Sequence, residues 1–186
     1  MSGSPDRRRE RFELLYRELY EPIAGYVLRR TRNPEDAAEA IAETFTTLWR
    51  RLDTCPGDEV VRAWLFGVAR RVLANQRRGE RRRSALVERV TAVLDGGEAA
   101  VALAPVSDGR VARAFATLSE TDREVLALVA WEGLTREQLS FALGISRPVA
   151  RLRLHRARRR FESALDREAA VAAPARIRLS EGGEEL

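Results

Sequence analysis

Residues Thr135–Phe161 read TREQLSFALGISRPVARLRLHRARRRF, and this stretch decides the fold of the C-terminal part of the chain. Its apolar spacing predicts a helix of about nine residues, a short turn and a longer second helix. That is the arrangement of a helix-turn-helix, whose second helix enters the major groove of DNA. Gly144 suits the left-handed conformation that ends the first helix, Ile145 can fill the angle between the helices, and Ser146 can cap the second.

The second helix of this motif is strongly basic. It holds seven arginines between Arg147 and Arg160 and no acidic residue, a charge density suited to DNA phosphates. An advance of about 100° per residue places five apolar side chains on one inward face: Ala150, Leu154, Ala157, Phe161 and Leu165. A basic helix can also be simply solvated or cover another protein, but the preceding helix and turn favour the DNA-binding interpretation.

The whole chain is predicted to be all-α, because apolar residues recur three or four positions apart almost throughout and no stretch alternates with a period of two. Pro22 should kink or break the first helix, and Asn33 with Pro34 supplies an N-cap and a first-turn proline for the second. Capping boxes are expected at Ser119 with Asp122 and at Thr135 with Gln138. Helices are expected at about 7–32, 33–52, 60–78, 110–117, 119–131, 135–143 and 146–165.

These helices are predicted to form two small helical domains joined by a flexible linker. The linker is expected at 84–109, where the helical pattern weakens and glycine, alanine and proline accumulate. The N-terminal domain then covers 7–83, and the C-terminal domain with the helix-turn-helix covers 110–167. The small and polar residues of 168–186 are expected to form a disordered tail.

Helical periodicity also predicts which side chains face the core. In the helix after Asn33 the inward residues are expected to be Ala38, Ile41, Phe45, Leu48 and Trp49. In the helix at 60–78 they are expected to be Trp64, Leu65, Val68, Val72 and Leu73. Trp64 is thereby assigned to the core rather than to a base-stacking surface.

Composition excludes several classes of function. The 186 residues carry 33 basic and 28 acidic side chains, a net charge of +5, and every basic one is arginine. Cys55 and His155 are the only cysteine and histidine, so an internal disulfide, a multi-cysteine zinc site or a histidine cluster is excluded, and no metal or cofactor is expected. No run of about 18 uncharged apolar residues occurs, and the N-terminus lacks a signal-peptide core, so a cytoplasmic protein without membrane insertion is expected.

Three blocks of sequence together resemble a known family. They are NPEDAAEAIAETFTTLWRRLD at 33–53, VRAWLFGVARRVLANQRRGERRR at 61–83, and LSETDREVLALVAWEGLTREQLSFALGIS…RLHRAR at 118–158. In this order they are similar to the bacterial RNA polymerase sigma factors of the extracytoplasmic-function type, over roughly 12–165. The resemblance implies a non-enzymatic transcription initiation factor that joins core RNA polymerase, directs it to a subset of promoters and helps to melt them.

The resemblance also implies how the polymerase is bound. The helix after Asn33 would dock on the beta-prime coiled coil, the C-terminal domain would contact the beta flap, and the linker would thread the RNA channel. Ala42 stands where the family commonly has glutamine. An anti-sigma protein is a further partner that the family often has. The implied polymerase-binding residues are Glu39, Ala42, Glu43, Thr46 and Trp49.

Two sets of residues are implied for promoter DNA, melted and duplex. The loop 51–62 corresponds to the family element that captures a flipped base, and the implied minus-ten residues are Arg62, Arg70, Arg71, Asn75, Arg77 and Arg78. Arg71 and Asn75 depart from the family's usual asparagine and aspartate. The implied minus-thirty-five residues are Arg136, Arg147, Val149, Arg151, Leu152, Arg153, Arg156 and Arg159.

Within the minus-thirty-five set, chemistry suggests different tasks. Arginine can bind guanine through two hydrogen bonds, and Val149 or Leu152 can contact a thymine methyl group. Arg153 and Arg158 are assigned to phosphates, with His155 as a neutral neighbour of the backbone. Pro148 is tolerated because the first turn of a helix has unpaired amides.

Three alternatives stay open on the sequence. The first is a helix-turn-helix regulator that binds duplex DNA without polymerase. The second is a sigma-like interaction module without promoter activity, which the residues at Ala42, Arg71 and Asn75 would permit. The third is an enzyme such as a recombinase or nuclease, but the N-terminal half offers no acidic cluster for a metal and no serine in an evident arginine-lined pocket.

Overall fold

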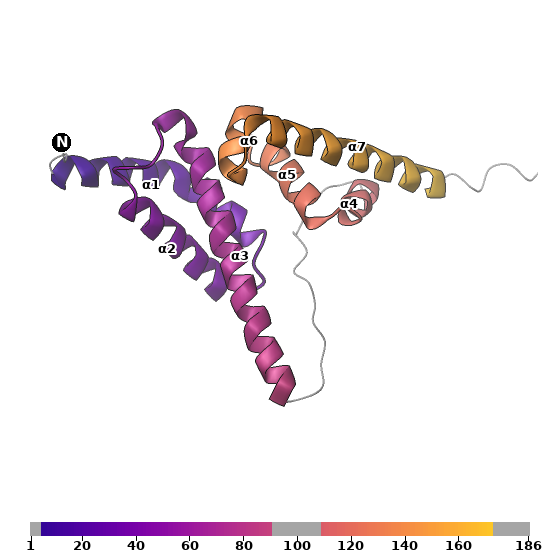
Figure 1. Ribbon diagram of the computed structural model, residues 1–186, viewed down its shortest axis with the longest axis horizontal. Coiled ribbons are helices and arrows are strands. Elements are labelled where there is room, and N and C mark those ends of the chain that lie inside the picture. Colours follow the sequence, from indigo (N-terminus) through magenta and orange to yellow (C-terminus); the bar gives the residue numbers. More distant parts are fainter. Residues whose placement is uncertain (1–4, 91–108, 173–186) are drawn as a thin grey trace, which may run out of the picture.

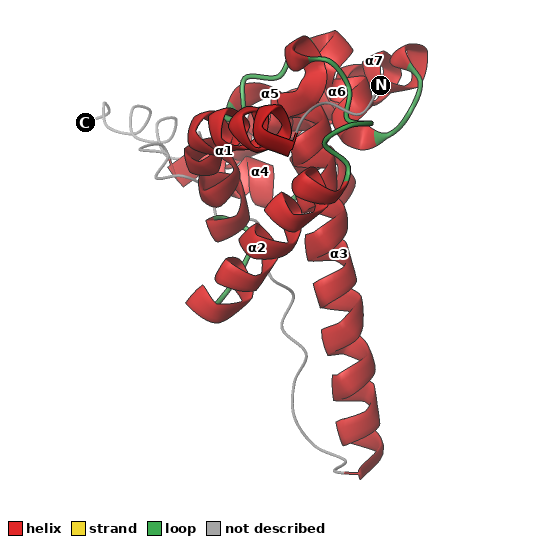
Figure 2. Ribbon diagram, turned by 90° about the vertical axis from the view of Figure 1, so that its left-hand side faces the viewer, coloured by secondary structure: helices red, strands yellow, loops and turns green. Residues whose placement is uncertain are grey.

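The computed structural model describes residues 5–90 and 109–172, and all regular structure within these ranges is helical (Figures 1 and 2). This confirms the all-α prediction. The described helices are α1 (Pro5–Leu28), α2 (Pro34–Arg50), α3 (Asp58–Val90), α4 (Gly109–Ala116), α5 (Glu120–Ala130), α6 (Arg136–Leu143) and α7 (Arg147–Ala172). None of them has both the length and the apolarity needed to cross a bilayer.

The long helix α3 organises the molecule. Helices α1 and α2 pack on one side of it and α6 packs on another, while its C-terminal half projects away from the rest (Figures 1 and 2). Leu65 and Phe66 on α3 are fully buried, and the ring of Phe66 meets Tyr26 of α1 edge-on at 5.2 Å between centroids. Burial of each large apolar side chain contributes about 1.5–3 kcal/mol.

The two halves of the chain share one continuous apolar core. Leu139 and Ala142 of α6 and Leu154 of α7 belong to the same buried cluster as Phe66 and Leu73 of α3. The two halves are therefore packed against each other in this structure. The predicted linker lies mostly outside the described residues, as do residues 173–186 of the predicted tail.

Most of the predicted local signals are confirmed. The side chain of Asn33 accepts a 2.7 Å hydrogen bond from the amide of Asp36, and Thr135 forms a full capping box with Gln138. Ser119 accepts a hydrogen bond from the backbone amide of Asp122, and its hydroxyl donates to the Asp122 carboxylate, so it caps α5 without the full capping box that was predicted. Gly144 ends α6 with a φ of 65°, in the left-handed region. Helices α6 and α7 therefore form the predicted helix-turn-helix.

Three helices differ from the sequence prediction. Helix α1 continues through Pro22 instead of breaking there, because buried Leu19, Ile23 and Tyr26 hold both sides of the proline against the core. Helix α7 continues beyond the predicted end at Leu165 to Ala172, and Arg113 of α4 binds Glu168 at 2.7 Å. Helix α3 also extends to Val90, into the segment expected to be linker.

The predicted inward faces of α2 and α3 were partly wrong. On α2, Ala38 and Trp49 are exposed, and the buried stripe is Ala37, Ala40, Thr44, Phe45 and Leu48. On α3 the predicted Leu65, Val68 and Leu73 are buried, Trp64 and Val72 are partly buried against the core, and Phe66 and Ala69 are buried as well. A helix packed on two sides has no single apolar stripe, so periodicity underestimates its buried surface.

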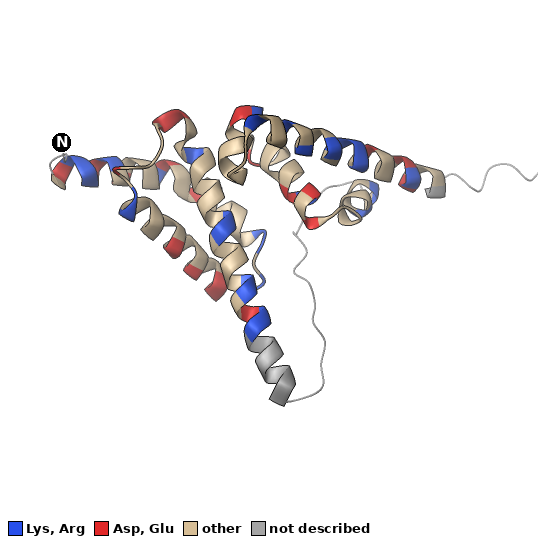
Figure 3. Ribbon diagram, in the orientation of Figure 1, with Lys and Arg blue, Asp and Glu red and all other residues tan. Residues whose placement is uncertain are grey.

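On α7 the predicted inward face is correct at Ala150, Leu154 and Ala157, which are all buried, and Phe161 and Leu165 are half-buried. Ala164 also belongs to this face and was not predicted. The opposite side of α7, which carries the arginines, is left to solvent (Figure 3).

The turn between α6 and α7 can be tested at Gly144. A Cβ at this position would meet no atom within 4 Å, so substitution acts only through the left-handed backbone. We expect Gly144→Ala to lower the free energy of unfolding by about 1–2 kcal/mol in urea titrations followed by circular dichroism. Gly79→Ala, in open space on α3, should instead raise it by about 0.5–1 kcal/mol. Equal effects of the two substitutions would contradict this assignment.

Candidate functional site

The predicted polymerase-binding residues lie together on the outer surface of α2. Glu39, Ala42, Glu43, Thr46 and Trp49 are all exposed, and the acidic residues follow one another along this helix in Figure 3. Asn33 caps α2, and Glu35 and Asp36 lie in its first turn. Because the cap determines where the helix begins, it also determines which residues of α2 lie on this acidic face. The face is suited to a basic partner.

An apolar groove, which no sequence pattern predicts, adjoins this acidic face. It runs between α1 and α2, and Ala42 forms part of its wall, together with Tyr16, Tyr20, Leu28, Ile41 and Phe45. The rings of Tyr16 and Phe45 lie 4.7 Å apart, which fixes the floor of the groove. A small alanine side chain at this position therefore widens an apolar surface, where a glutamine would add a polar group.

At the end of the same helix, Trp49 is exposed but held in place. Its ring packs edge-on against Phe12 at 5.2 Å, and the guanidinium of Arg8 lies 4.8 Å from the ring centroid. These contacts limit the motion of the tryptophan, so the five predicted residues and the groove form one preorganised surface.

The predicted minus-thirty-five residues are all exposed, on α7 and at the start of α6. A shallow groove between the two helices is lined by Arg136, Arg147, Arg151, Leu152 and His155, among others. Val149 and Leu152 leave 41% and 46% of their surface in solvent, so a ligand on this face of α7 can contact both. Arg156 and Arg159 are also exposed on α7, whereas Arg153 lines a different cavity, between the two halves of the chain.

The predicted minus-ten residues do not form a single open surface. Arg71, Asn75 and Arg78 are exposed on α3, and Arg78 donates a hydrogen bond to the side-chain oxygen of Asn75. Partial desolvation and then the like charges of Arg70 and Arg51 lower the pKa of Arg71. This accumulation of positive charge favours a bound anion such as a phosphate.

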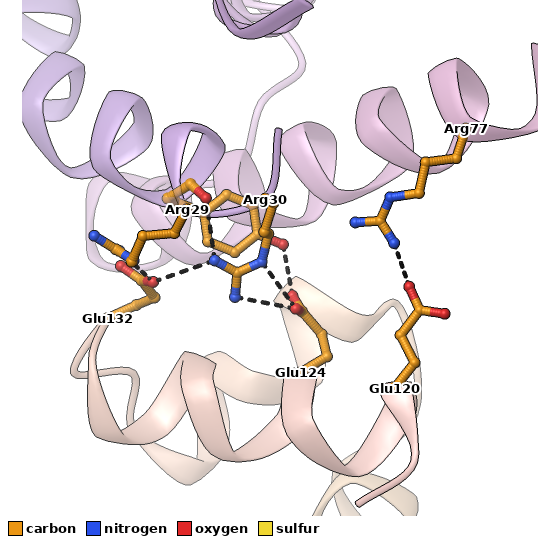
Figure 4. Close-up of polar contacts among 7 residues, drawn as sticks. Arg29, Arg30, Arg77, Glu120, Glu124 and Glu132 are labelled. Carbon is orange, nitrogen blue, oxygen red and sulfur yellow. Dashed lines mark hydrogen bonds and ion pairs between the residues drawn. The ribbon is translucent and has the colours of Figure 1, made fainter. Parts of the chain in front are cut away.

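The other three minus-ten residues contact the C-terminal half. Arg62 donates to the backbone carbonyl of Glu132 at 2.7 Å, and Arg70 donates to that of Leu143 at 3.2 Å. Arg77 pairs with the carboxylate of Glu120 on α5 (Figure 4). The structure thus divides the predicted set into three exposed residues and three that are engaged within the protein.

A buried ionic cluster lies beside these contacts. The side chain of Arg30, at the end of the α1 segment, is 1% exposed and donates from Nε to Glu124 at 3.0 Å, with Glu132 at 3.8 Å (Figure 4). Arg29 binds the same Glu132 at 2.7 Å, and the hydroxyl of Tyr26 donates to Glu124 at 2.5 Å. Burial and then the charge of Glu124 raise the pKa of Tyr26, which therefore stays a donor. We call these five residues the interdomain cluster.

Sequence reasoning missed this cluster. Its arginines and glutamates are far apart in the chain and each has the local pattern of a solvated helix residue, so no spacing rule connects them. One local signal did exist. Gly67 interrupts an apolar helical stretch, and an isolated glycine inside a helix often marks a close approach of another backbone.

Within the described residues, no group of three or more histidine, cysteine, aspartate or glutamate side chains is placed to hold a metal ion. The features that stand out are instead faces of opposite charge: an acidic face with an apolar groove on α2, and basic faces on α3 and α7 (Figure 3). Such a set of surfaces suits simultaneous binding of a protein and a nucleic acid.

Comparison with known proteins identifies the family of the chain. The chain matches the Sigma-70 region 2 family over residues 15–83 and the Sigma-70 region 4 family over residues 108–161. The ECF RNA polymerase sigma factor SigL of Mycobacterium tuberculosis is 31% identical over 155 residues, which cover 76% of this chain and 83% of SigL. RNA polymerase sigma factor YlaC of Bacillus subtilis is 26% identical over 156 residues, or 82% of this chain and 90% of YlaC.

Two solved structures share the fold. Sigma factor RpoE of Bartonella quintana, solved in complex with the anti-sigma factor NepR, aligns with a TM-score of 0.60 at 21% identity, over 84% of this chain and 98% of RpoE. CnrH, solved in complex with the cytosolic domain of CnrY, aligns with a TM-score of 0.56 at 22% identity, over 86% and 90%. With both sigma regions present in order and SigL similar over most of its length, the chain belongs to the ECF family of RNA polymerase sigma factors.

Proposed function

We propose that this protein joins core RNA polymerase through α2 and its C-terminal domain, directs it to a subset of promoters and helps to melt them. It works in the cytoplasm and has no catalytic activity of its own. The observation that carries the proposal is the separation of charge, acidic on α2 and basic on α3 and α7, within a chain that holds both sigma regions. The alternative of a regulator that works without polymerase gives no role to the acidic face and groove of α2.

The division of labour follows the division of the chain. Residues 7–83 form the domain that binds polymerase and the minus-ten element, 84–109 form the linker, and 110–167 form the domain that binds the minus-thirty-five element. Family matches at 15–83 and 108–161 support this assignment. An anti-sigma protein is a further partner in this proposal. RpoE was solved with the anti-sigma factor NepR, and CnrH was solved with the cytosolic domain of CnrY.

The central test is transcription with purified components. We expect core RNA polymerase with this protein to initiate from cognate promoters in a run-off assay on a genome-wide promoter set, and core polymerase alone not to do so. A gel shift with and without core enzyme accompanies it. Tight, specific binding of duplex DNA by the isolated protein, with no transcript from any promoter, would support the polymerase-independent regulator instead.

The docking face is tested by charge removal on α2. Because an exposed ion pair contributes about 0.2–1 kcal/mol, the double variant Glu39→Ala/Glu43→Ala should weaken binding to core polymerase about two- to thirtyfold. Affinity is measured by fluorescence anisotropy of the labelled protein. The matched control is Glu10→Ala/Glu18→Ala, which removes two exposed carboxylates from α1 that do not line the groove. An equal loss of affinity in the control variant would show that the effect comes from net charge alone, and would contradict the docking assignment.

The basic helix α7 is tested with the assembled holoenzyme. Arg151 lines the exposed groove beside Leu152, and Arg158 lies farther along the same groove. Arg151→Ala should cost about 1–3 kcal/mol on the cognate promoter and relax preference at one base of the minus-thirty-five element. Arg158→Ala should weaken binding to all sequences alike and reduce the salt slope by about 1. Unchanged base preference in Arg151→Ala would remove this residue from direct recognition.

A further inference from the structure

The loop between α2 and α3, residues 51–57, lies next to an exposed residue of the predicted minus-ten set. Partial burial and then the like charges of Arg70 and Arg51 lower the pKa of Arg71, so the start of the loop is close to Arg71. The hydrogen bonds within the loop, such as that from the amide of Thr54 to the carbonyl of Arg51 at 2.9 Å, join residues three positions apart. Such turns shape the loop, but they do not fix where it lies relative to the helices.

Arg11 of α1 ties this loop to the first helix. Its Nη1 donates to the carbonyl of Leu52 at 3.2 Å. Its Nη2 lies 3.6 Å from the Sγ of Cys55 and donates to the carboxylate of Asp58, the first residue of α3, at 3.3 Å. Because a guanidinium carries five N–H donors in a rigid fork, one side chain holds three points along the loop at once.

Arg8, three positions earlier on the same helix, holds the other end of the loop. Its Nη2 donates to the carbonyl of Trp49 at 2.8 Å, at the C-terminal end of α2, where the helix dipole favours a positive charge. Its Nη1 lies 3.4 Å from the carboxylate of Asp53. Together with Arg11, it connects the start of α1 to the loop from the last turn of α2 to the first residue of α3.

We propose that Arg8 and Arg11 are positioning residues, which hold the loop 51–57 in the conformation that receives the melted minus-ten strand. This inference rests on the proposed minus-ten function of the N-terminal domain. Both arginines precede residues 15–83, over which the chain matches Sigma-70 region 2. They act through the loop, because a loop that is ordered in advance loses less conformational freedom when it binds.

The order of the loop is measured at Cys55. This residue is the only cysteine of the chain and is half-buried in the loop, so alkylation by iodoacetamide reports on the loop alone. We expect Arg11→Ala to raise the rate of alkylation about five- to tenfold, because the loop opens more often. Loss of a nearby positive charge would by itself slow the reaction, since such a charge favours the reactive thiolate. A faster reaction therefore shows greater exposure of the thiol.

Two further variants separate geometry from charge. Arg9→Ala removes the same charge two positions away, where Arg9 is exposed and pairs with Glu13 of its own helix at 3.0 Å, and it should leave the rate unchanged. Arg11→Lys keeps the charge, but a single nitrogen cannot reach Leu52 and Asp58 as the fork does, so its rate should be intermediate. If Arg11→Ala does not fold, as judged by circular dichroism, Arg11→Lys carries both measurements.

Promoter opening is measured on the holoenzyme, with a promoter found in the run-off assay. Permanganate, which modifies unpaired thymines, gives the ratio of open to closed complexes. We expect Arg11→Ala to lower this ratio about five- to tenfold, because an untethered loop is ready for the strand only part of the time. Affinity for the duplex promoter in the closed complex should not change. A general loss of folded protein would lower both quantities alike.

Each result decides the proposal. An unchanged alkylation rate in Arg11→Ala would show that this arginine does not hold the loop, and a faster rate with an unaltered ratio of open to closed complexes would show that the order of the loop does not serve melting. Equal effects in Arg9→Ala would attribute both changes to net charge. Any of these outcomes overturns the positioning role. Wild-type holoenzyme that still opens its promoters then leaves the proposed function standing, whereas its failure to open any promoter overturns the function itself.

Discussion

The buried guanidinium of Arg30 is the constraint on which the arrangement of the two halves depends. An arginine does not lose its proton in proteins, so a side chain that is 1% exposed must be surrounded by acceptors. Glu124 and Glu132 supply carboxylates from the C-terminal half, the carbonyl of Tyr26 accepts at 3.1 Å, and the ring of Tyr26 lies 3.7 Å below the guanidinium carbon. Moving α5 away from α1 would leave the charge of Arg30 without its carboxylate partners. The ion pairs therefore hold the C-terminal half close to α1, where α6 packs against α3.

Helix α3 consequently carries two tasks on one surface. Its apolar residues join the cores of both halves, and its arginines emerge at the rim of that contact, where they meet the C-terminal half. The net charge of +5 does not reveal these two tasks, because they depend on where each charge lies in the structure. Glu39 and Glu43 of α2 are exposed, and the arginines of α7 are exposed while part of those on α3 are half-buried. Figure 3 shows the acidic residues on α2 and the basic ones on α3 and α7.

What the sequence predicts well is local. The caps at Asn33, Ser119 and Thr135 and the left-handed Gly144 depend on residues within four positions of each other, and the structure has them as predicted. The α7 face follows from simple periodicity, since α7 packs mainly on one side. The α3 face, the groove beside Ala42 and the interdomain cluster depend on contacts between distant segments, for which a single sequence holds no distance information.

The predicted minus-ten residues differ in how far a ligand can reach them in this structure. Arg71, Asn75 and Arg78 are exposed in the packed arrangement, so a phosphate can reach them without any movement of the C-terminal half. Arg62 and Arg70 each give an N–H to a backbone carbonyl of the C-terminal half, and Arg77 pairs with Glu120. Part of the hydrogen-bonding capacity of these three arginines is therefore already used within the protein.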